Sequence, residues 1–192
     1  MLGEYLALIV GAVLVNNFVL SRILGICPFL GVSKKPKTAL GMGGAVIFVM
    51  TLSGLVTSLI HHCVLKPCGM EYLRTIVFIL VIAALVQIVE VLLQRFSPAL
   101  YKALGIYLPL ITTNCAVLYV ALDNITQKYN LIETIVNSIA VPAGFMLVLV
   151  IFATIRERLA AADVPEAWKG NPIALVVAAI MAIAFSAFAG LV

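Results

Sequence analysis

Long apolar runs alternate with short polar connections along the whole chain. Uncharged or nearly uncharged runs occur at 5–21, 38–60, 75–94, 103–122, 134–155 and 172–192. A helix needs roughly 20 apolar residues to cross a bilayer, so the pattern predicts six transmembrane helices. The first run lacks the basic start of a cleavable signal and carries Glu4 instead, so we expect it to remain as a helix.

Composition agrees with this pattern. The chain has 192 residues, of which 64% are hydrophobic and 10% charged, and its mean hydropathy is +1.21. A soluble domain is about half apolar and about a quarter charged, so we expect one membrane domain without an appended soluble domain. The net charge of +4 does not indicate nucleic-acid binding, because the basic residues lie between apolar runs rather than on one face.

Basic residues are unevenly shared between the connections. The connections after the first, third and fifth runs hold Lys34, Lys35, Lys37, Arg95, Lys102, Arg156, Arg158 and Lys169. The connections after the second and fourth runs hold only Lys66, Arg74 and Lys128. The positive-inside rule therefore places the first group in the cytoplasm, and both termini face outward.

The two halves of the chain share weak similarities. Residues 1–97 and 98–192 each carry one cysteine in the first segment, Cys27 and Cys115, and each second helix opens with small residues. Three helices are an odd number, so related halves would enter the membrane in opposite orientations. We therefore expect an all-α integral membrane protein built from two inverted three-helix repeats.

The first helix of each repeat is expected to be broken into half-helices. The first segment runs for 28 residues, from Tyr5 to Val32, which is longer than one straight span needs. A break near Asn16–Arg22 would bring Cys27 to the depth of Cys115, and Pro109 favours a break in the fourth segment because it removes a backbone donor. Broken helices at membrane depth are tolerated where they are buried in protein or line a cavity.

The thiols have two interpretations on the residues alone. A buried cysteine usually behaves as a small inert hydrophobe, and the neighbouring Thr112, Thr113 and Asn114 would suit hydrogen bonds between helices. The alternative is a metal site, because thiolates bind iron–sulfur clusters and a [2Fe–2S] cluster takes four cysteines. Two matched thiols would then need two more from another chain.

Several longer motifs carry a resemblance to a known family. They are VNNFVL and LGICPFLGVSKK at 15–20 and 24–35, GIYLPLITTNCAVL at 105–118, and IRERL, ADVP and KGN within 155–171. Together they resemble the RnfA family over nearly the whole chain. RnfA proteins are membrane subunits of the Rnf complex, an ion-translocating ferredoxin:NAD+ oxidoreductase, and the motif at 15–35 looks more like RnfA than its relative NqrE.

The resemblance implies a shared cofactor. RnfA pairs with a homologous sister of opposite orientation, RnfE, and the two hold one [2Fe–2S] cluster inside the membrane. Carried over, the ligands in this chain are Cys27 and Cys115, with two further cysteines from the sister. Asn114, Thr113 and Gly25 would then supply hydrogen bonds to sulfur, which tune the potential.

The resemblance also implies a role and partners. The chain would relay electrons across a bacterial cytoplasmic membrane, coupled to Na+ or H+ transport. Its partners would be RnfE-, RnfB-, RnfC-, RnfD- and RnfG-like subunits, with flavins and nicotinamide held only by other subunits. The chain itself contains no G-x-G-x-x-G or P-loop motif.

Four further features have more than one interpretation each. Glu90, near the end of the third run, could take up a cation or be an interfacial acid near Arg95. Arg22 could pair with a carboxylate or carbonyl at the break, could stabilise an anionic cluster, or could extend to the interface.

The other two features lie in the connections. His61, His62, Cys63 and Cys68 could bind a metal, but an outward-facing disulfide between the cysteines is favoured because that side is oxidising. The connection at 156–171 is either a solvated loop or a docking surface with Trp168 as anchor.

Two other function classes compete with an electron relay. A secondary transporter also uses inverted repeats with broken helices near the midplane. A purely structural subunit would tolerate replacement of Cys27 and Cys115. Iron distinguishes the relay from the transporter, because a transporter has no need of two matched thiols.

Overall fold

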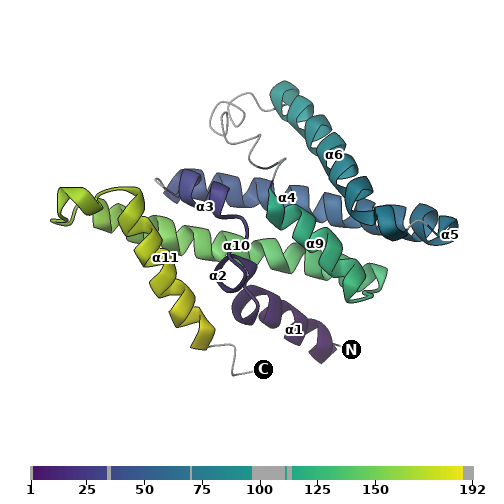
Figure 1. Ribbon diagram of the computed structural model, residues 1–192, viewed down its shortest axis with the longest axis horizontal. Coiled ribbons are helices and arrows are strands. Elements are labelled where there is room, and N and C mark those ends of the chain that lie inside the picture. Colours follow the sequence, from purple (N-terminus) through teal and green to yellow (C-terminus); the bar gives the residue numbers. More distant parts are fainter. Residues whose placement is uncertain (1, 34–35, 70, 97–110, 112–113, 188–192) are drawn as a thin grey trace.

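The computed structural model describes residues 2–33, 36–69, 71–96, 111 and 114–187, and all regular structure in that part of the chain is helical. The elements in chain order are α1 (Leu2–Val10), η1 (Gly11–Val15), α2 (Phe18–Ser21), α3 (Ile26–Val32), α4 (Pro36–Ile60), η2 (His61–Leu65), α5 (Lys66–Cys68), η3 (Glu71–Leu73), α6 (Arg74–Phe96), α9 (Cys115–Thr126), α10 (Leu131–Ala160), η5 (Glu166–Trp168) and α11 (Asn171–Ser186). Figure 1 shows α4 and α10 as the long central pair.

Three helical stretches are long and apolar enough to cross a membrane: Pro36–Leu65, Glu71–Leu92 and Leu131–Ala160. They confirm the second, third and fifth predicted spans. The shorter apolar helices α9 and α11 coincide with parts of the fourth and sixth predicted runs. The six-span inverted repeat stays a prediction, since half of the fourth run, 103–110 and 112–113, lies outside the described residues.

The first segment is broken where the sequence predicts. Its helix ends at Val15, Asn17 starts α2, and the chain leaves helical geometry again at Arg22 before α3 begins. Asn17 holds the break in place: its Oδ1 accepts a hydrogen bond from the Val19 N–H, and its Nδ2 donates to Gly144 O on α10 at 3.0 Å. The expected break at Pro109 lies outside the described residues.

Helices α4 and α10 make the most extensive contact in the structure. Their register is antiparallel, because Gly43 of α4 lies against Met146 of α10, whereas Gly54 lies against Ser138. A Cβ on either glycine would meet those side chains, so the small residues are what permit the close approach. Thr51 Oγ1 also donates to Ser138 O across this interface, at 3.3 Å.

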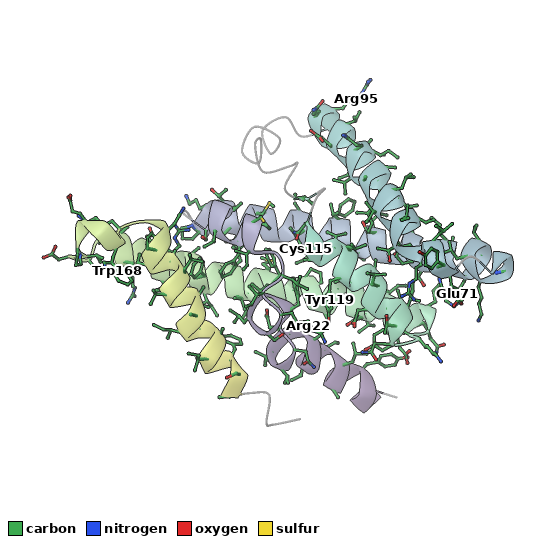
Figure 2. The ribbon with its side chains drawn as sticks, viewed as in Figure 1. Arg22, Glu71, Arg95, Cys115, Tyr119 and Trp168 are labelled. Carbon is green, nitrogen blue, oxygen red and sulfur yellow. The ribbon has the colours of Figure 1, made fainter. Side chains whose placement is uncertain are left out.

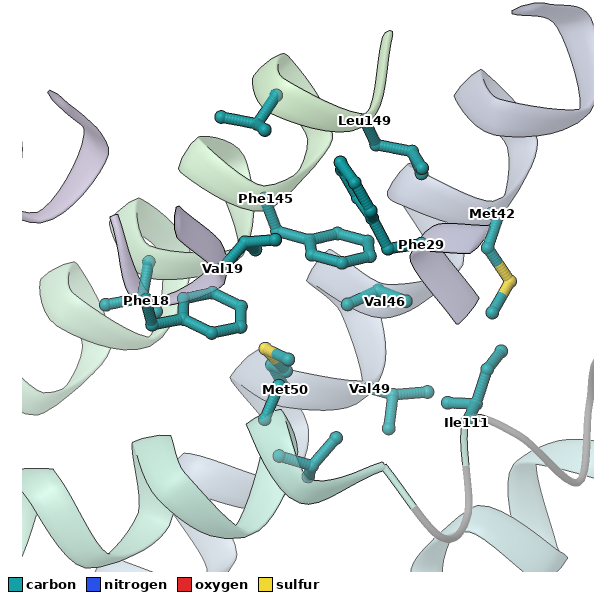
Figure 3. Packing of buried hydrophobic residues seen from close by; sticks show 14 of the residues in the cluster. Phe18, Val19, Phe29, Met42, Val46, Val49, Met50, Ile111, Phe145 and Leu149 are labelled. Atoms are coloured by element: carbon teal, nitrogen blue, oxygen red, sulfur yellow. The ribbon is translucent and has the colours of Figure 1, made fainter. Parts of the chain in front are cut away.

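Aromatic side chains fasten the short helices α2 and α3 onto α10. The ring of Phe18 stacks on Phe145 with centroids 6.0 Å apart, and Phe29 stacks on Phe152 with centroids 4.3 Å apart. All four side chains are fully buried, and Figure 3 shows Phe18, Phe29 and Phe145 together with residues of α4. The core therefore fixes both pieces of the broken segment to one long helix.

The polar connections gather at two ends of the molecule. The connections after α4 and after α9 border one cavity, so they lie at the same end. The connection between α10 and α11, which carries Trp168, lies at the opposite end, as Figure 2 shows by the positions of Trp168 and Glu71. Of the three connections predicted to be cytoplasmic, this is the one that the structure describes throughout, and the orientation of the chain in a membrane stays a prediction.

Candidate functional site

Both predicted cysteine ligands lie in the first turn of a helix. Cys115 is the first residue of α9 and Cys27 the second residue of α3. Both are exposed, free thiols. Both sulfurs are therefore accessible at the start of a helix, where a ligand or a partner chain could reach them.

One hydrogen bond brings the two cysteine motifs together. The backbone N–H of Gly25 donates to Cys115 Sγ at 3.2 Å, although the two residues are 90 positions apart. Gly25 has φ of 76°, a left-handed conformation that favours glycine. An added Cβ would lie 3.5 Å from Ala116 Cβ and 3.6 Å from Asn114 Oδ1, so the turn before α3 packs directly on the start of α9.

Asn114 directly precedes Cys115, and only one of its two side-chain amide atoms forms a hydrogen bond. Its Oδ1 accepts a hydrogen bond from Ala116 N at 3.0 Å and so caps α9. Its Nδ2 is buried and has no hydrogen-bond partner. Buried donors normally have an acceptor, so this amide is a donor left over next to Cys115. Thr113, the third residue predicted to support the sulfur, lies outside the described residues.

The chain by itself supplies too few ligands for a closed metal site. In the described part of the chain, no three His, Cys, Asp or Glu side chains come together. Two exposed thiols, one of them with the Gly25 N–H at its sulfur, are half of the four cysteines that a [2Fe–2S] cluster takes. The other half would have to come from another chain, as the sequence analysis also required.

Arg22 packs against α9 close to this site. Its guanidinium carbon lies 5.3 Å from the centroid of the Tyr119 ring, one helical turn after Cys115 (Figure 2). Among the described residues Arg22 forms no salt bridge, but Asp123, one turn after Tyr119 on α9, lies within electrostatic reach of the guanidinium. The contact supports a structural role for Arg22 at the break.

Glu90 lies on α6. It is half-buried at the border of an otherwise apolar cavity of about 390 Å³, lined by α4 residues such as Leu40 and Phe48 and by Ile111. No ion pair with Arg95 is found in the part of the chain that the structure describes. The alternative of an acid held by Arg95 therefore gains no support, and cation uptake by Glu90 stays a prediction.

Arg156 has a role that the sequence analysis missed. Its Nη1 donates to Leu30 O at 2.9 Å and to Ser33 Oγ at 2.7 Å, at the C-terminal end of the helix that begins beside Cys27. The sequence analysis placed Arg156 only in a docking loop, and no local pattern marks a contact to residues so distant in sequence. Trp168, which is 53% exposed, remains free for that role, and docking stays a prediction.

The connection that carries His61, His62, Cys63 and Cys68 does not contain the predicted disulfide. Cys63 carries a free thiol, which contradicts the expected disulfide with Cys68. The two residues lie five positions apart in the continuous helical stretch η2–α5, more than one turn from each other. His62 Nδ1 is 3.1 Å from Ser58 O of its own helix, and the described residues here form no metal-binding group.

Comparisons with known proteins cover almost the whole chain. Residues 5–192 match a family model described as "Rnf-Nqr subunit, membrane protein". The chain is 58% identical to a protein of Acetobacterium woodii that is named as part of the "Na(+)-translocating ferredoxin:NAD(+) oxidoreductase complex", with 96% of each chain covered. It is 56% and 57% identical to proteins of Vibrio parahaemolyticus and Yersinia enterocolitica that are named as subunits of an "Ion-translocating oxidoreductase complex", with 98% of each chain covered.

Proposed function

The chain belongs to the Rnf-Nqr family of membrane subunits, and on that premise we propose that it is the electron-relaying membrane subunit of an ion-translocating ferredoxin:NAD+ oxidoreductase complex. The names of its relatives support membership in such a complex, because the similarity extends over nearly the full length of both chains. The cofactor of the chain and the path of the transported ion are part of what we propose.

We infer that Cys27 and Cys115 would hold half of a [2Fe–2S] cluster, with two further thiolates from an RnfE-like sister of opposite orientation. The observation that carries this inference is the hydrogen bond from Gly25 N–H to Cys115 Sγ, because it joins both cysteine motifs at one sulfur. When bound, the cluster supplies a one-electron carrier inside the membrane.

The surrounding residues would orient the ligands and tune them. The Gly25 N–H donates to Cys115 Sγ, and the Asn114 Nδ2 is an unpartnered donor on the preceding residue. Hydrogen bonds to sulfur tune a cluster's potential. Arg156 donates a hydrogen bond to Leu30 O at the end of α3, and the Phe29 ring of α3 stacks on Phe152 of α10. These two contacts restrain the short helix that carries Cys27.

We propose six spans arranged as inverted repeats, 1–97 and 98–192, in the bacterial cytoplasmic membrane with both termini outside. The antiparallel register of α4 and α10, the second helices of the two halves, supports this arrangement.

The complex would contain further RnfB-, RnfC-, RnfD- and RnfG-like subunits, which would hold the flavins and bind nicotinamide. Na+ or H+ would move with electron transfer. Glu90 is our candidate for cation uptake, because it is a half-buried carboxylate facing an apolar cavity between α4 and α6.

The test is to purify this chain with only its RnfE-like sister and to measure iron, sulfide and the EPR spectrum after reduction. We expect a [2Fe–2S] signal that disappears in Cys27→Ser and in Cys115→Ser. Cys63→Ser is the matched control, because Cys63 is also an exposed free thiol but lies outside both motifs.

A well-folded pair without iron would refute the relay proposal. The secondary-transporter alternative would then be tested by measuring Na+ uptake into vesicles that contain the pair. A signal that survives both motif substitutions would instead place the cluster on other cysteines and refute only the ligand assignment.

A further inference from the structure

A polar cavity of about 710 Å³ opens at the end of the molecule opposite Trp168. It is formed by the end of α4 with η2 and η3, and by the connection between α9 and α10. Neither the cysteine motifs nor Glu90 contribute to it. The volume is in the range of cavities that hold a small ligand or a headgroup.

The lining of this cavity carries an excess of positive charge. Lys66, Arg74 and Lys128 border it, against one carboxylate, Glu71. Among the described residues none of these cations forms an ion pair with Glu71 or another carboxylate. Unpaired cations inside a recess focus a positive potential there, because the protein walls screen charge less than water does.

Two buried nitrogen atoms in the lining also lack hydrogen-bond partners. Arg74 Nε and His61 Nδ1 are buried and have no hydrogen-bond partner, and His61 as a whole is only 9% exposed. Buried polar atoms in folded proteins normally have a partner, so atoms left over in one cavity indicate a ligand or water. Unpaired cations together with unpartnered nitrogen atoms in one cavity favour an anion as the ligand.

Two carboxylates behind the lining, Asp123 and Glu133, offset part of this potential. Burial, together with the charges of Asp123 and Glu133, raises the pKa of Tyr129, so its hydroxyl stays protonated and can donate. Asp123 and Glu133 do not line the cavity, and Glu133 Oε2 already accepts the N–H of Asn130 at 2.9 Å.

We propose that this cavity binds a phosphate group. Lysine and arginine are the usual partners of phosphate, and a phosphodiester would accept hydrogen bonds from Arg74 and His61 together. Apolar side chains in and next to the lining are exposed: Leu131, in the lining, is 52% exposed, and its neighbour Ile132 is 62% exposed. They suit acyl chains, so the headgroup of an anionic phospholipid and free inorganic phosphate are the two sources that the experiment separates. The site is independent of the proposed redox function.

The experiment is native mass spectrometry of the full chain in detergent with added phosphatidylglycerol, and with phosphatidylcholine as the zwitterionic comparison. We expect phosphatidylglycerol to be retained preferentially and Arg74→Gln to weaken its binding about tenfold, as the loss of one charge-assisted contact implies. Arg74→Lys should retain part of the binding. Lys169→Gln is the matched control, because it removes an exposed lysine at the opposite end.

Inorganic phosphate is titrated in the same preparation. Phosphate that raises the melting temperature of wild type but not of Arg74→Gln, without retained phosphatidylglycerol, would support the site and assign free phosphate as its source. Equal retention of both lipids with no effect of phosphate would overturn the proposal, as would unchanged binding in Arg74→Gln. If Arg74→Gln fails to fold, Lys66→Gln and Lys128→Gln make the same test from the other two cations, since both are exposed.

Discussion

The contact of Arg156 with α3 can be tested without any cofactor. Arg156→Met keeps an aliphatic stem on the Phe152 ring but removes the donor that reaches Leu30 O and Ser33 Oγ. Hydrogen bonds from a charged group contribute about 1.5–3 kcal/mol each. Arg156 is half-buried, and Ser33 Oγ also lies 3.4 Å from Leu30 O as a substitute donor, so we take about 2 kcal/mol for the pair.

A loss of that size should appear as local opening of α3. Hydrogen exchange of peptides covering α3, measured by mass spectrometry in detergent, should accelerate roughly 30-fold in Arg156→Met, because 1.4 kcal/mol corresponds to about a factor of ten. Arg158→Met is the matched control, since Arg158 is exposed in the same last turn of α10. Equal exchange of α3 in the two variants would refute the idea that Arg156 restrains the helix that carries Cys27.

Two further substitutions test the packing of the break and of the central pair. Asn17→Ala removes the cap of α2 and the hydrogen bond to Gly144 O, so we expect a loss of about 2 kcal/mol in thermal unfolding, whereas Asn16→Ala, at an exposed neighbour, should change little. Gly54→Ala should destabilise by about 1–3 kcal/mol, because its Cβ would collide with α10. Gly44→Ala is its control, since no atom lies near the Cβ there; equal melting temperatures within either pair would contradict the packing described.

Composition and the pattern of apolar runs were sufficient to predict the long helices. They were insufficient to predict which residues hold the short helices in place. Apolar runs predict α4, α6 and α10 because lipid as solvent leaves few alternatives to a helix. Asn16, Asn17 and Arg22 mark the break because polar groups inside an apolar run need partners. Gly144 accepts a hydrogen bond from Asn17, and Arg156 donates one to Leu30 at the end of α3. Both lie more than a hundred positions from these partners, and no local sequence pattern indicates such contacts.

The candidate site was predictable only in part. Cys27 and Cys115 came from the family resemblance, whereas composition alone would have treated them as inert thiols. Asn114 was predicted near sulfur, but its division into a capping oxygen and an unpartnered amide depends on backbone geometry at the start of α9. The predicted disulfide between Cys63 and Cys68 is wrong, because Cys63 is a free thiol. The spacing of the two cysteines did not show that the connection continues as a helix.

The broken segment explains why sulfur lies where it does. A helix broken at membrane depth leaves backbone donors and acceptors that lipid cannot satisfy, and each would be costly if unpaired. Asn17 and Asn114 take up the first donors of α2 and α9, and Arg156 takes up a carbonyl at the end of α3. The N–H of Gly25 has Cys115 Sγ as its acceptor. A thiol is a weak acceptor, whereas a thiolate or a metal-bound sulfur is a stronger one. The same hydrogen bond that closes the break would therefore strengthen when Cys115 becomes a ligand, and this links the fold of the broken segment to the proposed redox role.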